Sequence, residues 1–409
     1  MPEKTILLAY GAPQHEAEFI DHAGIISLDG MNIRLSQEAV HLGVVRTIEP
    51  SNNSAITDRI SAYKRQLYSL LPPGIALIHH GSPAASLRIH TLYCLPVLLS
   101  GLPSLVLSKS EVKILSTCFK TNLQRLMKLP EKTPDPAIYF LAGSLPLEAI
   151  LHLRQLSLFS MICHMQNNVL KDHAIRTLTN KKDKSWFHVL RSICVQYDLP
   201  HPLNLLYSPP VKSNFKSLCK SKVHDYWHRK LSHDAQRLPS LCFMDPCYLS
   251  LSSPHPLWCS LDGNSYQSEA AFIQALFLSG RYRTEMLCRF WSQNVHGFCL
   301  ICLNSNLKIA GTMEHILLQC DGLTGERRRL YDLSRDFVAD NPILKPILDA
   351  YLYCDNNDLK MRFLLDCSVL PDVITAKQLL GDKVHHLLFK LTRTWCRSIH
   401  RARLRKLGR

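Results

Sequence analysis

Residues 299–320 read CLICLNSNLKIAGTMEHILLQC, and this stretch constrains the fold more than any other. Cys299 and Cys302 form a Cys-x2-Cys turn, and His315 and Cys320 follow as His-x4-Cys. Thiolates and imidazole nitrogens suit the tetrahedral coordination of Zn²⁺, and the short turn lets two sulfurs reach one ion. Chance would produce the whole pattern roughly 0.01 times in a chain of this composition, so we predict a zinc knuckle rather than buried thiols beside a surface histidine.

The predicted ligands indicate a structural site, because three thiolates and one imidazole fill a tetrahedron and leave no position for a catalytic water. A five-residue step on an ideal α-helix turns by about 140°, so Cys320 is expected where a helix from Met313 ends, just before Asp321 and Gly322. A second group of three cysteines and one histidine has wider spacing and no comparable turn, and this spacing fits loose core packing better than a metal site. Its members are Cys242, Cys247, His255 and Cys259.

The composition favours an intracellular, nucleic-acid-binding protein. The 409 residues include 48 Lys and Arg against 33 Asp and Glu, which leaves a formal charge of +15. This charge favours a polyphosphate partner over an anionic membrane. The longest apolar run, 91–108, is interrupted by Pro and Gly and is too short to span a bilayer, and the N-terminus lacks the features of a signal peptide. We therefore expect a nuclear or cytoplasmic chain with reduced cysteines.

The apolar spacing predicts a mainly α fold with a small N-terminal β element. Asp29-Gly30 indicates a hairpin, and helices are expected from Ile56 to a stop at 72–74 and near the C-terminus, where two or three should finish the chain. Four further predicted helices are Ser86–Leu99, Ser110–Leu129, Leu147–Leu170 and Gln267–Phe277. The expected segments are a β-rich piece (1–50), a helical domain (51–178), a basic linker region (179–265), the knuckle domain (266–330) and a helical basic region (331–409).

Basic residues surround the knuckle in the sequence and continue to the C-terminus. Arginines recur every four residues from Arg393 to Arg405, opposite an apolar face, which predicts an amphipathic helix that contacts a phosphate backbone or, alternatively, a merely solvated face. Ahead of the knuckle, arginines alternate with aromatic rings, a pairing that can hold single strands. The predicted nucleic-acid contacts are Arg281, Arg283, Arg289, Arg327, Arg328, Arg329, Arg393, Arg397, Arg401 and Arg405.

These motifs together resemble the region after the polymerase domain of LINE-type, non-LTR retrotransposon reverse transcriptases. The resemblance rests on Leu278–Thr284, on the Cys-x2-Cys pair and on Glu314–Cys320. Pro2–Thr5 and the string His41, Leu42, Gly43, Val44 are similar to the last palm motifs of that family, the second to its primer grip. Residues 55–170 are similar to its thumb and 364–395 to its C-terminal end. The resemblance therefore implies the end of a palm, a thumb-like domain, a CCHC knuckle and a basic helical tail.

The resemblance does not extend to polymerase activity. That family needs palm aspartates that hold two metal ions, whereas this sequence has no Asp-Asp pair and begins after the expected position of those motifs. Asp366, Asp372, Asp382 and Lys383 do not make the acidic cluster of a restriction-like endonuclease. We expect a non-catalytic fragment with structural Zn²⁺ and no small-molecule substrate, which clamps RNA, DNA or an RNA–DNA duplex for a polymerase core encoded upstream. The alternatives are a host-retained zinc-containing adaptor or regulator, and a decayed element that does not fold in isolation.

Overall fold

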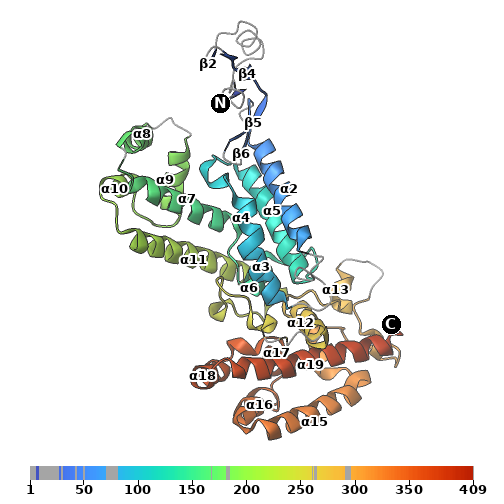
Figure 1. Ribbon diagram of the computed structural model, residues 1–409. Helices are drawn as coiled ribbons and strands as arrows, with labels where there is room; N and C mark the ends of the chain where they lie inside the picture. The colour runs from blue at the N-terminus through green and yellow to red at the C-terminus, as the bar shows by residue number, and fades with distance from the viewer. Residues whose placement is uncertain are drawn as a thin grey trace. The chain divides into compact units, whose positions relative to one another are not determined.

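The structure is a computed structural model that describes residues 6–8, 27–28, 31–41, 44–48, 51–70, 82–166, 168–180, 185–259, 261, 265–290 and 296–408. The described chain is mainly helical and carries short strands only near its N-terminus, as the sequence predicts. Its contacts divide it into two compact units, each assembled from separate stretches of sequence. Unit 1 comprises 1–72, 89–119 and 146–226, and unit 2 comprises 73–88, 120–145 and 227–409. Figure 1 labels the elements of both units.

The N-terminal strands form three two-stranded pairs. Strand β1 (Ile6–Leu7) runs parallel to β4 (Arg34–Leu35). Strands β2 (Ser27–Leu28) and β3 (Met31–Asn32) are antiparallel, with Leu28 opposite Met31, so the hairpin predicted around Asp29-Gly30 is confirmed although the two turn residues lie outside the described part. Strands β5 (Glu38–His41) and β6 (Val44–Thr47) form a second hairpin. In the primer-grip-like motif, His41 ends β5, and Leu42 and Gly43 lie outside the described residues.

Unit 1 is a helical assembly around an apolar core. Helix α2 (Asn53–Ser69) buries Ala55, Ile56, Tyr63 and Leu67, close to the stripe expected from the sequence. The other elements of the unit are η2 (His90–Cys94), α4 (Leu95–Leu99), η3 (Leu102–Ser104), α7 (Leu147–Cys163), α8 (Asn168–Thr179), α9 (Trp186–Gln196) and α10 (Pro202–Tyr207). Three helices have residues in both units: α3 (Pro83–Ile89), α5 (Lys109–Leu126) and α11 (Lys212–Gln236).

Two helix boundaries differ from those expected from the sequence. The predicted helix Ser86–Leu99 contains one wide π turn, His90–Cys94, whose wider spacing a regular 3.6-residue pattern does not show. The predicted helix Leu147–Leu170 ends at Cys163, and α8 begins at Asn168. His164 follows α7 directly, and its Nδ1 lies 2.7 Å from the Ser160 carbonyl and its Nε2 3.0 Å from the Pro210 carbonyl, so this side chain bonds to backbone at the end of the helix.

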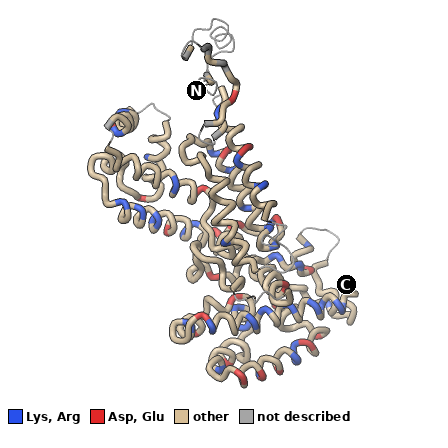
Figure 2. The backbone as a smooth tube through the Cα atoms, viewed as in Figure 1, with Lys and Arg blue, Asp and Glu red and all other residues tan. Residues whose placement is uncertain are grey.

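Residues 179–265, expected as a basic linker region, contain helices α9, α10 and α11 and three 3₁₀ turns. Helix α11 buries one side chain every four residues, namely Phe215, Cys219, Val223, Trp227, Leu231 and Ala235. Its lysines Lys212, Lys216 and Lys220 are exposed, and Figure 2 shows several blue positions along the helix. The many lysines and prolines of this region indicated a linker, but a single apolar stripe is enough for a helix to pack.

Unit 2 packs its helices around α19 (Lys383–Lys406), which contacts α12 (Ser265–Leu278), α15 (Thr324–Asp340), α17 (Asn357–Asp366) and α18 (Pro371–Leu380). Trp258, Phe363, Phe389 and Trp395 are fully buried in this core. The remaining elements are α6 (Asp135–Ala142), η4 (Pro239–Leu241), η5 (Pro246–Tyr248), η6 (Pro256–Trp258), α13 (Glu285–Arg289), α14 (Leu300–Leu303), η7 (His315–Gln319), η8 (Asp321–Leu323), η9 (Pro342–Leu344), α16 (Lys345–Tyr351) and η10 (Cys367–Val369).

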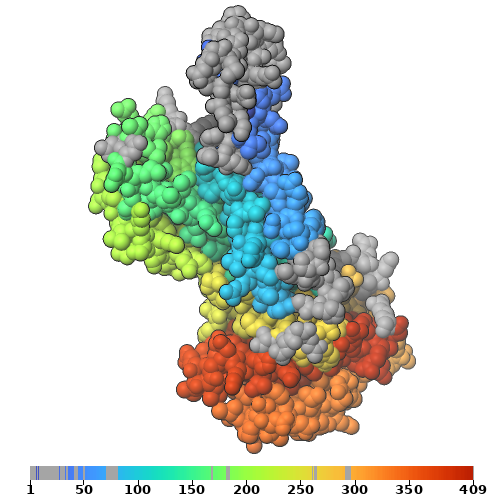
Figure 3. Space-filling view, in the orientation of Figure 1, coloured from blue at the N-terminus to red at the C-terminus, as the bar shows by residue number. Residues whose placement is uncertain are grey.

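The C-terminal region is more divided than the sequence suggests. Two or three helices were expected after the knuckle, whereas α15, α16, α17, α18 and α19 lie there. Prolines at the starts of η9, α16 and α18 fit first-turn positions and separate consecutive helices. In Figure 3 the orange and red surfaces of α15 to α19 lie against one another. Within the described chain no single helix has the length and hydropathy to cross a membrane, although the bent pair α6 and α7 meets both criteria jointly.

Candidate metal centre

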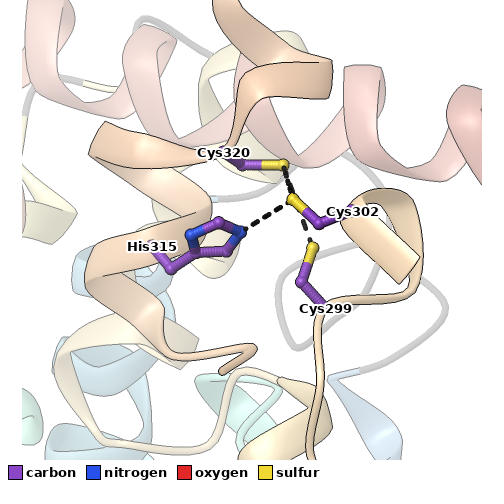
Figure 4. Close-up of side chains that lie close together, drawn as sticks. All are labelled: Cys299, Cys302, His315 and Cys320. Atoms are coloured by element: carbon purple, nitrogen blue, oxygen red, sulfur yellow. Dashed lines mark hydrogen bonds between the residues drawn. The ribbon is translucent and has the colours of Figure 1, made fainter. Parts of the chain in front are cut away.

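Cys299, Cys302, His315 and Cys320 converge on one point, as the sequence predicts (Figure 4). One ligand atom from each residue lies within 4.8 Å of the others, and all four side chains are buried. The Sγ atom of Cys320 lies 3.8 Å from that of Cys299 and 3.6 Å from that of Cys302. His315 Nε2 lies 3.3 Å from Cys302 Sγ. A disulfide would bring two sulfurs to about 2.05 Å, so the cluster is a group of free thiols that could hold a metal ion.

The first two ligands are presented by a tight loop and a single helical turn. The Cys299 amide donates to the Ile309 carbonyl (2.8 Å), and the Leu307 amide donates to the Cys302 carbonyl (2.9 Å). Asn306, at φ +62°, lets the chain reverse between these two bonds, a backbone conformation that asparagine tolerates better than most residues. The turn α14 therefore projects both sulfurs to the same side.

The second two ligands are aligned by a π turn. Residues 315–319 form η7, and the Cys320 amide donates to the His315 carbonyl at 2.7 Å, an i to i+5 bond. On an ideal α-helix these side chains would diverge by about 140°, but one π turn holds about five residues and brings Cys320 back over His315. The helix from Met313 does end at Cys320, as predicted from the sequence, and only its winding differs. Thr312 Oγ1 accepts from the His315 amide (3.1 Å) and begins this helix.

Two glycines keep the loops of the centre close to their neighbours. A Cβ on Gly311 would lie 2.5 Å from Glu285 Oε2 and 3.2 Å from the Cys299 nitrogen. A Cβ on Gly322 would lie 2.2 Å from Ile301 Cγ2. Real Cβ contacts are longer than this, so a side chain at either position would push a ligand-bearing loop outward.

The thiols of the cluster influence one another's protonation. A hydrogen bond from Cys320 lowers the pKa of Cys299 to about 5, and backbone amides of Cys302 and Ile301 act in the same direction. The hydrogen bond to Cys299 and burial both raise the pKa of Cys320, and burial raises that of Cys302. Of the three sulfurs, that of Cys299 therefore carries negative charge most readily. A bound cation would replace the protons on the other two.

Glu285 and Arg403 form a buried ion pair beside the centre, which the sequence analysis did not identify. Arg403 Nη2 donates to Glu285 Oε1 at 2.8 Å, and Arg403 Nη1 donates to the Arg283 carbonyl at 3.0 Å. Glu285 Oε1 also lies 3.4 Å from the Leu300 amide, next to the ligand Cys299. The pair thus connects α19 to the knuckle. Its members are 118 residues apart, so no local pattern signals the contact.

The ten arginines expected to contact nucleic acid divide into exposed and buried ones. Arg283, Arg289, Arg328, Arg329, Arg401 and Arg405 are exposed, and Arg281 and Arg397 are half-buried. Arg397 Nε donates to Glu269 Oε2 (2.8 Å) and its guanidinium stacks on Tyr266, while Arg401 pairs with the same carboxylate. Arg329 Nη2 lies 2.6 Å from Glu326 Oε1, and Arg405 Nη2 lies 3.9 Å from Glu326 Oε2.

Arg393 and Arg327 do not present phosphate-binding groups, contrary to the expectation from the sequence. Arg393 has no exposed surface, and its guanidinium donates to the carbonyls of Phe389, Leu257 and Cys259. Four-residue steps on a helix drift by about 40° each, so the first arginine of the series lies on the buried face although the last is exposed. Arg327 is 8% exposed.

The second group of candidate ligands does not form a metal site in the described residues. Cys242, Cys247 and Cys259 are exposed, and the four do not lie within ligand distance of one another. His255 is committed elsewhere, since its Nε2 lies 3.0 Å from Asp366 Oδ2 and its Nδ1 accepts from the Leu257 amide (3.1 Å). Of the acidic residues considered for a nuclease, Asp372 accepts from Tyr351 and Asp382 pairs with Lys377.

Comparison with known proteins identified no relative. No protein-family profile matches the chain, and no curated protein and no solved structure matches it.

Proposed function

We propose that this chain binds nucleic acid through a basic surface that a structural zinc ion holds in place. The term basic surface denotes Arg283, Arg289, Arg328, Arg401, Arg405 and Lys406, all of which are exposed. The observation that carries the proposal is that these cations come from three separate segments joined around the four-ligand cluster. Figure 2 shows the blue positions that recur along the last turns of α19.

The distances within the cluster favour zinc. With Zn–S bonds of about 2.3 Å, a regular tetrahedron places neighbouring sulfurs about 3.8 Å apart. The observed separations of Cys320 Sγ from the other two sulfurs are 3.8 and 3.6 Å. Three sulfurs and one nitrogen complete the coordination, and the burial of all four residues excludes solvent. This donor set supports a structural role for the ion, because no coordination position is left for a substrate or water.

Specific contacts hold the three segments together. The bonds from Arg403 to Glu285 and to the Arg283 carbonyl join the end of α19 to α13. Arg329 Nη2 lies 3.4 Å from Ser398 Oγ and joins α15 to α19. The last ligand, Cys320, is directly followed by η8 and α15. Loss of the ion would therefore release the segments that carry Arg289 and Arg328.

The charges of the basic surface suit a phosphate backbone. Arg283, Arg289, Arg328 and Lys406 make no ion pair with any described residue, so their cationic groups are available to a ligand. Guanidinium groups pair bidentately with phosphate oxygens without reading sequence. The resemblance of the motifs to the region after a reverse transcriptase polymerase domain adds RNA or an RNA–DNA duplex as the expected ligand. The proposal is binding without nucleotide polymerisation.

A salt titration tests the proposal. Fluorescence anisotropy would measure binding of single-stranded RNA, single-stranded DNA and an RNA–DNA duplex of one length to the full chain. Replacing Arg283, Arg289 and Arg328 with Gln should make the slope of log K against log salt shallower by about 2 to 3, since each lost phosphate contact removes about 0.7 to 0.9.

A matched triple variant controls for total charge. Lys132, Lys383 and Lys390 are exposed and make no ion pair with a described residue, and they lie outside the basic surface. Their replacement with Gln should leave the slope within about 1 of the unmodified chain. An equal reduction of the salt slope in the two variants, or a salt-independent affinity of the unmodified chain, would disprove the assigned surface. Template-dependent incorporation by the pure chain with Mg²⁺ would contradict the absence of polymerisation.

A further inference from the structure

An open cavity of about 610 Å³ in unit 2 is lined by residues of α15, of α16 and the two residues after it, and of α17. Its polar lining consists of Tyr331, Arg335, Lys345, Asp349, Tyr353 and Lys360, with two apolar side chains between them. None of these residues belongs to the basic surface or to the metal cluster. In Figure 3 this region is the orange part of the surface.

The lining has an excess of positive charge. Lys345 and Lys360 make no ion pair with any described residue, whereas Arg335 Nη1 lies 3.0 Å from Asp332 Oδ1. Counting Asp332 and Asp349 against the three cations leaves one net positive charge, and the two lysines provide the cationic groups that are not already neutralised. An ammonium group is a strong point-charge partner for phosphate.

Two tyrosines form an aromatic wall of the cavity. Tyr331 and Tyr353 have ring centroids 6.3 Å apart and planes inclined by 37°. The buried Trp395 ring packs nearly perpendicular to that of Tyr331, with centroids 4.9 Å apart, and limits the movement of the first ring. The hydroxyl of Tyr353 is buried and has no hydrogen-bond partner in the described part of the chain.

We propose that this cavity binds a nucleoside phosphate: the lysines hold the phosphate, and the tyrosines contact the planar base. Asp349 would repel phosphate but can accept hydrogen bonds from sugar hydroxyls, which orients the ligand. A carboxylate or a simple inorganic anion would use the lysines and leave the aromatic wall without a partner. Only a ligand with both a phosphate and a planar base can use the lysines and the tyrosine rings together, which favours a nucleotide over a carboxylate or a simple inorganic anion.

The nucleotide has two possible sources, a free molecule or the phosphorylated end of a strand. Arg328 of the basic surface and Arg335 of the cavity are seven residues apart on α15, which places them on one side of the helix and roughly 10 Å apart along its axis. A strand that crosses the basic surface could therefore end in the cavity. Only this second source rests on the proposed function, and a free nucleotide would bind even if the basic surface did not.

Titration calorimetry on the full chain would measure the binding of ADP, adenosine and inorganic pyrophosphate. ADP should bind more tightly than either fragment. Lys345→Gln or Lys360→Gln should weaken ADP binding about tenfold, because each removes one charge-assisted bond to the phosphate. Lys383→Gln, an exposed lysine outside the cavity, is the matched control and should leave ADP affinity unchanged. Pyrophosphate binding as tight as ADP, unaltered affinity in both lysine variants, or no ADP binding would overturn the proposal.

Oligonucleotides with and without a 5′-phosphate distinguish the sources. Tighter binding of the phosphorylated strand, with a difference abolished by Lys345→Gln, assigns the strand end to the cavity. Equal binding of the two strands together with ADP binding assigns a free nucleotide. The Arg283, Arg289 and Arg328 triple variant should keep its ADP affinity while losing strand affinity. A chain that binds ADP but no strand refutes the proposed function and leaves this inference standing.

Discussion

Replacing Cys302 with Ser should weaken zinc binding by about two to three orders of magnitude. The Cys302 sulfur lies 3.6 Å from Cys320 Sγ and 3.3 Å from His315 Nε2, so it shares two edges of the ligand tetrahedron, and a hydroxyl there is a poor substitute for a thiolate. Structural zinc contributes about 10 to 16 kcal/mol in small zinc domains, and four equal ligands would each account for about 2.5 to 4 kcal/mol. The variant should therefore bind zinc about 70-fold to 900-fold more weakly.

Competition with a chromogenic chelator would measure this loss, and cobalt substitution would report the thiolate ligands directly. The unmodified chain should release one zinc ion per molecule. Cys288→Ser is the matched control, because Cys288 lies on α13 near the centre, is half-buried and is not a member of the cluster. Limited proteolysis should show new cleavage between residues 280 and 330 in the Cys302 variant alone. Retention of one tightly bound zinc by the Cys302 variant would refute the ligand assignment.

Three further predictions concern stability, each measured by chemical denaturation. Gly143→Ala should destabilise unit 2 by more than about 3 kcal/mol, because φ is +59° and the new Cβ would lie 1.7 Å from a backbone oxygen. In the control Gly325→Ala, on α15, the new Cβ meets no atom within 4 Å, and the variant should be stabilised by up to about 1 kcal/mol. Equal changes in the free energy of unfolding for the two variants would refute the close approach of the backbone at Gly143. Glu285→Gln should cost about 3 to 5 kcal/mol because it leaves the buried Arg403 without its carboxylate, and a second change, Arg403→Met, should restore much of the loss. Burial lowers the pKa of His90 from 6.5 to about 4, so on acidification the unfolded chain binds the proton first. His90 should therefore account for about 2 kcal/mol of the fall in the free energy of unfolding between pH 7.5 and pH 5, beside the similarly shifted His152, His385 and His400. His90→Gln should reduce that fall by about 2 kcal/mol, and an unchanged pH dependence would exclude this histidine as a contributor.

Local patterns accounted for the elements that depend on neighbouring residues. The hairpin between β2 and β3 followed from Asp29-Gly30, and the long basic helix α19 from its apolar stripe. The metal cluster followed from four residues within 22 positions, because a Cys-x2-Cys turn and a short helix bring their own ligands together. The π turn at η7 was not predicted, since its winding depends on how residues 315–320 pack against the rest of the centre.

Patterns along the chain did not reveal which charged residues face solvent. Arg393 and Arg401 occupy equivalent places in a four-residue repeat, yet one is fully buried and the other exposed, because the helices that cover α19 determine the buried arc. The ion pair of Glu285 with Arg403 and the wall formed by Tyr331 and Tyr353 likewise join residues that no local spacing relates.

The sequence by itself determined the four members of the Cys/His cluster, the mainly α character and the excess of positive charge, since side-chain chemistry and short-range spacing are properties of the chain. Tertiary packing alone decided which arginines remain at the surface, which buried polar groups find partners, and that α15, α16 and α17 line one open cavity. These outcomes depend on contacts between residues far apart in sequence, and the free energy of such contacts comes from burial, which only the folded chain defines.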